Sequence, residues 1–112
     1  MKYGMVLVKE DAGWESLSEA ERDFDTIVQW WIDLRRKGLI QTGAELGPPR
    51  TATTIAFDGD EAVITDGPFL EAKETVGGFG ILNVETREEA IEIARTWPSR
   101  RNLKIEIRPI VS

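Results

Sequence analysis

The stretch that decides the fold is the first predicted strand, which reads Tyr3-Gly4-Met5-Val6-Leu7-Val8-Lys9. Successive side chains of a strand point to opposite faces of a sheet, and here both alternating sets are apolar. The two sets are Tyr3, Met5 and Leu7 on one face and Gly4, Val6 and Val8 on the other. Such a strand is covered on both sides, so the fold needs two covers for its sheet.

A long amphipathic helix is predicted to begin at Ser18, which forms a capping box with Glu21. Basic residues 35–37 suit the negative end of the helix, and Gly38 is the expected left-handed cap. The apolar residues that recur at helical spacing are Phe24, Ile27, Val28, Trp31 and Leu34.

A shorter helix follows a second capping box, formed by Thr86 and Glu89, and is ended by Pro98. Its expected buried stripe consists of Ala90, Ile93, Ala94 and Trp97. The last strand has one wet face, because Leu103, Ile105 and Ile107 alternate with Lys104, Glu106 and Arg108.

The middle of the chain predicts a β-hairpin. Residues 41–50 form an ordered loop, apart from a short strand that could open it. Residues 51–57 and 62–65 are rich in β-branched residues and flank the turn-forming residues 58–61. A further loop then leads to a strand at about residues 76–84.

Two helices, each between strands, together with a hairpin, indicate an α+β fold: a single ferredoxin-like (split βαβ) domain over residues 1–112. Both helices then cover one face of the sheet. We expect a second copy of the chain to cover the other face, sheet to sheet, in a homodimer.

The composition removes several chemistries, because the 112 residues include no cysteine and no histidine. Disulfide scaffolds, cysteine nucleophiles, serine–histidine triads and Cys/His zinc sites are excluded. A net charge of −6 disfavours nucleic acid as a partner. The apolar run at the N-terminus is too short for a signal peptide or a membrane span, so we expect a cytoplasmic protein. No regularly spaced acidic set predicts a metal site, and we expect no cofactor.

The densest group of chemically capable residues is 65–74, which reads Thr-Asp-Gly-Pro-Phe-Leu-Glu-Ala-Lys-Glu. In a structural interpretation, Asp66, Gly67 and Pro68 make a turn and Phe69 fills the core. In a functional interpretation, Asp66 ends a strand beside a cleft that Phe69 helps to line. Acid–base work then falls to Asp66, Glu71 or Glu74, since histidine is absent.

Two cations are candidates for holding an anionic substrate. Lys73 lies within the same group, and Arg50 follows a stiff Gly-Pro-Pro stretch from which it could bind a carboxylate bidentately. Glu74 is the remaining polar candidate for substrate binding. An exposed arginine in such a position is, in the alternative interpretation, merely solvated.

Glycines and tryptophans mark other positions of interest. The spacing of Gly77, Gly78 and Gly80 is wrong for a nucleotide-binding loop, so a bulge or close backbone packing is favoured over approach of a ligand. Trp14 and Trp30 lie off the predicted core stripes and could line a pocket or a dimer seam.

At these motifs the chain resembles the YCII-related family, specifically the branch named for its Asp-Gly-Pro-Phe (DGPF) motif, here Asp66-Gly67-Pro68-Phe69. The resemblance covers nearly the whole chain and implies a dimeric α/β barrel. Some YCII relatives have a histidine–aspartate pair proposed as catalytic, which this chain cannot complete. Gly80 also stands where a tyrosine is common in this branch.

The resemblance leaves two functions open. In the first, a cytoplasmic homodimer binds a small metabolite near the DGPF loop, and any catalysis is a cofactor-free isomerase, lyase or hydrolytic step with Asp66 as acid or base. In the second, implied by relatives encoded beside or fused to extracytoplasmic-function sigma factors, the chain is a non-catalytic accessory module that binds a sigma factor or another protein.

Overall fold

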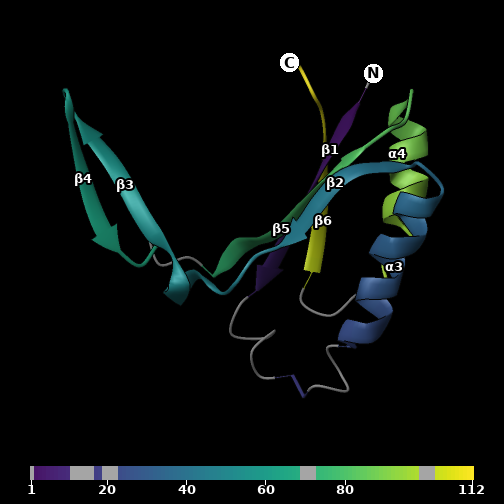
Figure 1. Ribbon diagram of the computed structural model, residues 1–112, viewed down its shortest axis with the longest axis horizontal. Coiled ribbons are helices and arrows are strands. Elements are labelled where there is room, and N and C mark those ends of the chain that lie inside the picture. The colour runs from purple at the N-terminus through teal and green to yellow at the C-terminus, as the bar shows by residue number, and fades with distance from the viewer. Residues whose placement is uncertain (1, 11–16, 19–22, 69–72, 99–102) are drawn as a thin grey trace.

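The computed structural model describes residues 2–10, 17–18, 23–68, 73–98 and 103–112. Its main sheet is antiparallel, with strand order β2-β5-β1-β6. The strands are β1 (Tyr3–Glu10), β2 (Ile40–Glu45), β5 (Glu74–Leu82) and β6 (Leu103–Pro109). Helices α3 (Phe24–Arg36) and α4 (Arg87–Ala94) lie on the same side of this sheet (Figure 1). The arrangement is α+β and compatible with the predicted ferredoxin-like fold.

The predicted hairpin is confirmed as a separate two-stranded sheet of β3 (Thr53–Asp58) and β4 (Glu61–Asp66). A short 3₁₀ helix, η1 (Pro49–Thr51), precedes it. The turn between the strands contains Gly59 at a φ of 61°, a conformation that favours glycine. In Figure 1 the hairpin stands away from the main sheet on the side opposite the helices.

Strand β2 is longer than predicted, because it continues to Glu45 through residues expected to be loop. Glycine is a weak strand former, yet Gly43 is paired with Gly80 of β5. The indole of Trp31 occupies the space above both glycines. Packing against a helix therefore overrides the local propensity at this position.

Helix α3 begins at Phe24, later than the predicted Ser18, and Glu21 lies outside the described residues. Its N-cap is Asp23, whose carboxylate accepts a hydrogen bond of 2.8 Å from the Thr26 hydroxyl. The helix ends as predicted, with Gly38 at a φ of 70°. The N–H of Leu39 donates to the carbonyl of Leu34, which completes the cap.

The predicted stripe of α3 is only partly correct, because Phe24 and Val28 are exposed. Ile27, Trp31 and Leu34 are buried. The core-facing stripe is therefore rotated toward Trp30, which packs against the core from the other side of the expected stripe.

Three tryptophans join the helices. Trp30 meets Trp97 edge to face with ring centroids 4.8 Å apart, and Trp31 meets Trp97 in the same way at 5.8 Å. The Trp30 Nε1–H donates to Thr96 Oγ1 at 2.8 Å. Trp30 therefore lies between the two helices rather than in a pocket or dimer seam, whereas Trp14 lies outside the described residues.

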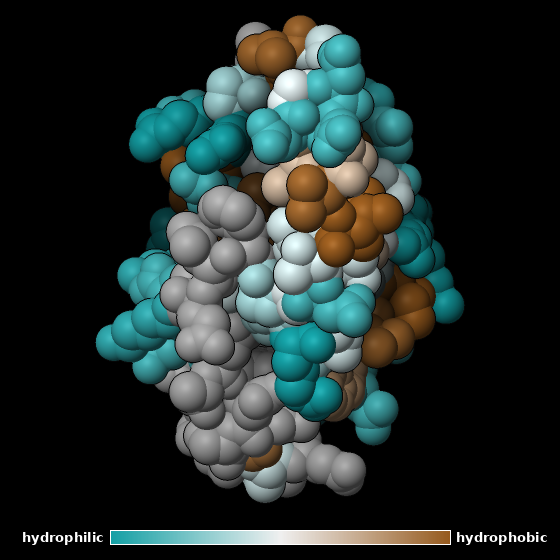
Figure 2. Space-filling view, turned by 90° about the vertical axis from the view of Figure 1, so that its left-hand side faces the viewer, coloured by the Kyte–Doolittle hydropathy of each residue, from teal (hydrophilic) through white to brown (hydrophobic). Residues whose placement is uncertain are grey.

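The other side of the main sheet, here called the open sheet face, has no helix or strand over it among the described residues. Val76 and Phe79 on it are 50% and 41% exposed. Figure 2 views the molecule from the side that carries the hairpin and shows apolar side chains gathered in patches between polar ones. The open sheet face comprises Gly4, Val6, Val8, Glu10, Thr42, Ala44, Glu74, Val76, Phe79, Ile81, Lys104, Glu106 and Arg108.

Gly43→Ala tests the contact between α3 and the sheet. A Cβ at Gly43 would lie 2.4 Å from Trp31 Cζ3 and 3.0 Å from the Phe79 carbonyl oxygen, and neither atom belongs to a flexible chain. We expect a loss of about 1–3 kcal/mol of unfolding free energy, and a lower midpoint in thermal denaturation. Gly4→Ala is the control, because its nearest neighbours would be 3.7 Å away. Equal midpoints for the two variants would contradict the role given to Trp31.

Candidate functional site

The Asp66-Gly67 turn is held against the start of the hairpin. Asp66 is the last residue of β4, lies opposite Thr53 and is exposed. Gly67 has a φ of 97°, its N–H donates to the Ala52 carbonyl at 2.7 Å, and its carbonyl accepts from the Thr54 hydroxyl at 2.7 Å. The backbone of this turn therefore has a structural role, which leaves the Asp66 carboxylate open to solvent.

Arg50 lies in the turn ahead of β3, whose first residue, Thr53, is paired with Asp66. Arg50 belongs to η1, and its side chain is exposed. The Thr51 hydroxyl donates to the Pro48 carbonyl at 2.6 Å and fixes this turn. We call the base of the hairpin, with Arg50 and Asp66, the DGPF corner.

Lys73 and Glu74 are placed at the start of β5, and both are exposed. Glu74 lies on the open sheet face, where its Oε1 accepts a hydrogen bond of 2.6 Å from Lys104 Nζ. Glu74 therefore has a partner on β6, away from the DGPF corner. Phe69 and Glu71 lie outside the described residues.

An ion pair that the sequence analysis did not identify, between buried Lys9 and the more exposed Glu45, lies on the helix-covered side of the sheet. Lys9 continues the alternation of Met5 and Leu7 and is only 6% exposed. Its Nζ donates to Glu45 Oε2 at 3.0 Å, from β1 to β2 across the intervening β5. A charged residue in phase with a buried apolar set was the available signal, since such a residue needs a partner.

The glycines of β5 leave room for the Lys9 side chain to pass over this strand and reach Glu45. The register of β1 and β5 shifts between Leu7 and Val8, where Gly77 is the extra residue of a bulge. A Cβ at Gly77 would lie 2.4 Å from Lys9 Cδ, and one at Gly78 would lie 2.9 Å from the Ala44 carbonyl oxygen. The predicted bulge and close packing are both confirmed.

A second candidate site is a hollow of about 340 Å³ beside the start of α4. Its lining is almost entirely apolar, because Glu88, Glu89 and Glu92 contribute mainly their aliphatic stems beside Leu39, Val84 and Ile93. Such a hollow suits a small apolar group, although its size is at the lower end for ligand sites.

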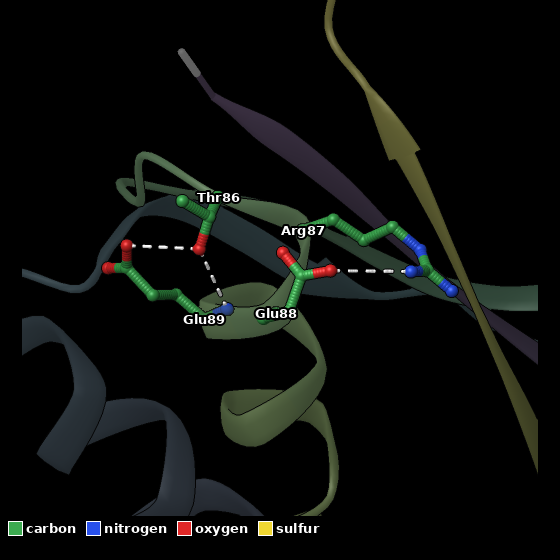
Figure 3. A network of polar contacts seen from close by, with 4 residues as sticks. All are labelled: Thr86, Arg87, Glu88 and Glu89. Carbon is green, nitrogen blue, oxygen red and sulfur yellow. Dashed lines mark hydrogen bonds and ion pairs between the residues drawn. The ribbon is translucent and has the colours of Figure 1, made fainter.

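The carboxylates around this hollow already have partners (Figure 3). Glu89 and Thr86 form the predicted capping box: the Glu89 N–H donates to Thr86 Oγ1 at 3.2 Å, and the hydroxyl donates to Glu89 Oε1 at 3.1 Å. Glu88 pairs with Arg87 at 3.4 Å. These contacts stabilise the helix start and reduce the negative charge available to a ligand.

The structure also bears on membranes and metals. None of the described helices is long and apolar enough to span a bilayer. Within the described ranges, no three acidic side chains gather as a metal site would require.

Lys104 offers a pH-dependent test of the open sheet face. The hydrogen bond that Lys104 donates to Glu74, and then the negative charge of Glu74, raise the pKa of Lys104 above the ordinary 10.5. Because this pKa is raised in the folded state, the stabilisation by the pair is present below the unfolded pKa and is lost as the pH rises through the folded pKa.

We therefore expect Glu74→Gln to lower the pKa of Lys104 toward its ordinary value. An NMR titration of the Lys104 side chain between neutral and strongly alkaline pH measures this shift. Glu106→Gln is the control, because Glu106 pairs with Arg108 on the same strand. An unchanged titration of Lys104 in Glu74→Gln would show that the pair does not form in solution.

Comparison with known proteins agrees with the fold and its motifs. The chain is 26% identical to "Uncharacterized protein R00369" of Rhizobium meliloti (strain 1021), in an alignment that covers 98% of this chain and 92% of that protein. A family model described as YCII-related domain matches residues 1–112. The chain thus belongs to the YCII-related family.

Proposed function

We propose that this protein is a cytoplasmic homodimer of the DGPF branch that binds a small organic acid at the DGPF corner. The observation that carries the proposal is the uncovered open sheet face, which is apolar along the middle of its central strands β1 and β5 and charged toward its edge on β6. The corner borders this face, because the Leu46 N–H, just ahead of η1, donates to the Gly77 carbonyl of β5 at 2.9 Å. A second copy on the open sheet face would therefore also enclose the corner.

The exposed area supports a dimer. The chain exposes 7722 Å². A compact monomer of 12.6 kDa exposes about 6,200 Å² by the usual scaling of area with mass. The excess, about 1,500 Å², exceeds the roughly 800 Å² per partner that a standard interface buries and falls in the range of permanent homodimers.

Enclosure would also remove the Asp66 carboxylate from bulk water and hold it close to a bound ligand, as a general acid or base requires. In the proposed site Arg50 or Lys73 holds the anionic group of the ligand and Asp66 faces its reacting atoms. Any reaction there is a cofactor-free isomerisation, elimination or hydrolysis.

The alternative, a non-catalytic module that binds a sigma factor or another protein, has one supporting observation. The hollow beside α4 has an apolar lining, which suits an apolar side chain of a partner protein. This is the weaker proposal, because the glutamates beside the hollow already form ion pairs within the chain, Glu88 with Arg87 and Glu92 with Arg95, and so offer a partner little free charge.

The dimer has a direct test in multi-angle light scattering. We expect the wild type to have about twice the 12.6 kDa mass of one chain at micromolar concentration. Phe79→Asp should yield monomers, because it places a charge in the apolar centre of the interface. Val111→Asp is the control, since Val111 is exposed but lies outside the open sheet face. A monomeric wild type would refute the proposed assembly.

Ligand binding is tested by thermal shift against a panel of small organic acids. A ligand at about a hundredfold over its Kd adds roughly 2.7 kcal/mol, which should raise the midpoint by roughly 10 °C. We expect Asp66→Asn to abolish the shift and Asp58→Asn, at the other end of the same hairpin, to retain it. A different result would be that no acid raises the melting midpoint of the wild type while Asp66→Asn has a lower midpoint. The DGPF motif would then be a structural turn, and a protein partner would be the next ligand to test.

A further inference from the structure

The hairpin of β3 and β4 packs very little against the other elements of its own chain. Neither β3 nor β4 makes more than marginal contact with any other described helix or strand. The radius of gyration is 15.7 Å, against about 13 Å for a compact chain of this length. An isolated two-stranded hairpin is at best marginally stable in water, so this one needs something to pack against.

One face of the hairpin carries the apolar surface for such packing. Ile55 and Ile64 are directly paired, and Phe57 follows on the same face. They are 56%, 68% and 77% exposed. Asp66 lies on this face as well, because it pairs with Thr53 and alternates in phase with Ile64.

We propose that the hairpin is a clasp that packs its Ile55–Phe57–Ile64 face on a second copy of this chain and carries Asp66 into the interface. The proposal rests on the homodimer proposed above and adds that the DGPF corner is complete only when the second copy is present. By two-fold symmetry each dimer has two clasps.

The number of residues available favours a second copy as the occupant. A standard interface uses about 20–30 residues from each partner. The open sheet face supplies roughly a dozen, too few alone. The clasp face extends it with Thr53, Ile55, Phe57, Ala62, Ile64 and Asp66, which brings the total near the lower end of that range.

Apolar side chains on the clasp face and in the middle of the open sheet face also favour a second copy as the occupant. In a two-fold dimer each patch meets a patch of the same chain, so apolar surfaces on hairpin and sheet are matched without a further partner. Figure 1 shows the hairpin on the side of the sheet that the open sheet face occupies, where a second copy would meet both.

Dimer dissociation constants test the clasp. We expect Phe57→Ser and Ile64→Ser each to weaken dimerisation at least tenfold in sedimentation equilibrium, since central apolar anchors dominate interfaces. Val111→Ser, which removes a still more exposed apolar side chain outside the clasp, should match the wild type. Circular dichroism melts check that each variant is folded. A dimeric wild type whose affinity both hairpin variants retain would overturn the clasp and leave the homodimer standing, whereas a monomeric wild type would overturn both.

Cross-linking gives a second measurement that does not rely on weakened variants. The chain has no cysteine, so Asp60→Cys at the hairpin turn accepts a single benzophenone maleimide. We expect irradiation to yield a covalent species of twice the chain mass, and Glu92→Cys on the helix side to yield none. Adducts only within one chain from Asp60→Cys would overturn the clasp.

Discussion

The approach of α3 to the main sheet depends on the indole of Trp31 filling the space of two missing side chains, at Gly43 and Gly80. The contact sets the distance between the helix layer and the sheet, and with it the position of the other two tryptophans. Trp97 meets both Trp30 and Trp31 edge to face, so the middle of α3 and the end of α4 are fixed through one aromatic group. Among the described residues, the buried indole N–H groups of Trp31 and Trp97 have no hydrogen-bond partner.

The two faces of the sheet consequently differ in kind. Under the helices, Met5, Leu7 and Leu82 are fully buried and the glycines of β5 allow close approach. On the open sheet face the same strands present valine, phenylalanine and isoleucine with no described element above them. The proposed homodimer and the proposed clasp would both cover the exposed side of the molecule. They would also remove Asp66, which is exposed in the single chain, from water.

Local sequence patterns predicted most elements, because strand alternation, capping boxes and turn glycines act over a few residues. The hairpin turn, the Gly38 cap, the Thr86–Glu89 box and the last strand are examples. The patterns failed where a distant residue decides the outcome. The length of β2 depends on Trp31, the rotation of α3 toward Trp30 depends on Trp97, and the burial of Lys9 depends on Glu45, 36 residues away. For the candidate site, the sequence placed Asp66 correctly at the end of a hairpin strand but could not show that this hairpin projects from the main sheet.

The crossing of Lys9 over Gly77 has a consequence for how the sequence can change over time. A side chain at position 77 would displace Lys9 from Glu45, and loss of either charged residue would remove this ion pair. A substitution at any one of positions 9, 45 and 77 is therefore disfavoured until the residues at the other two positions have changed. Relatives that bear a larger residue at the position of Gly77 should carry a shorter or uncharged residue in place of Lys9. The three positions should then covary although they are far apart in the chain.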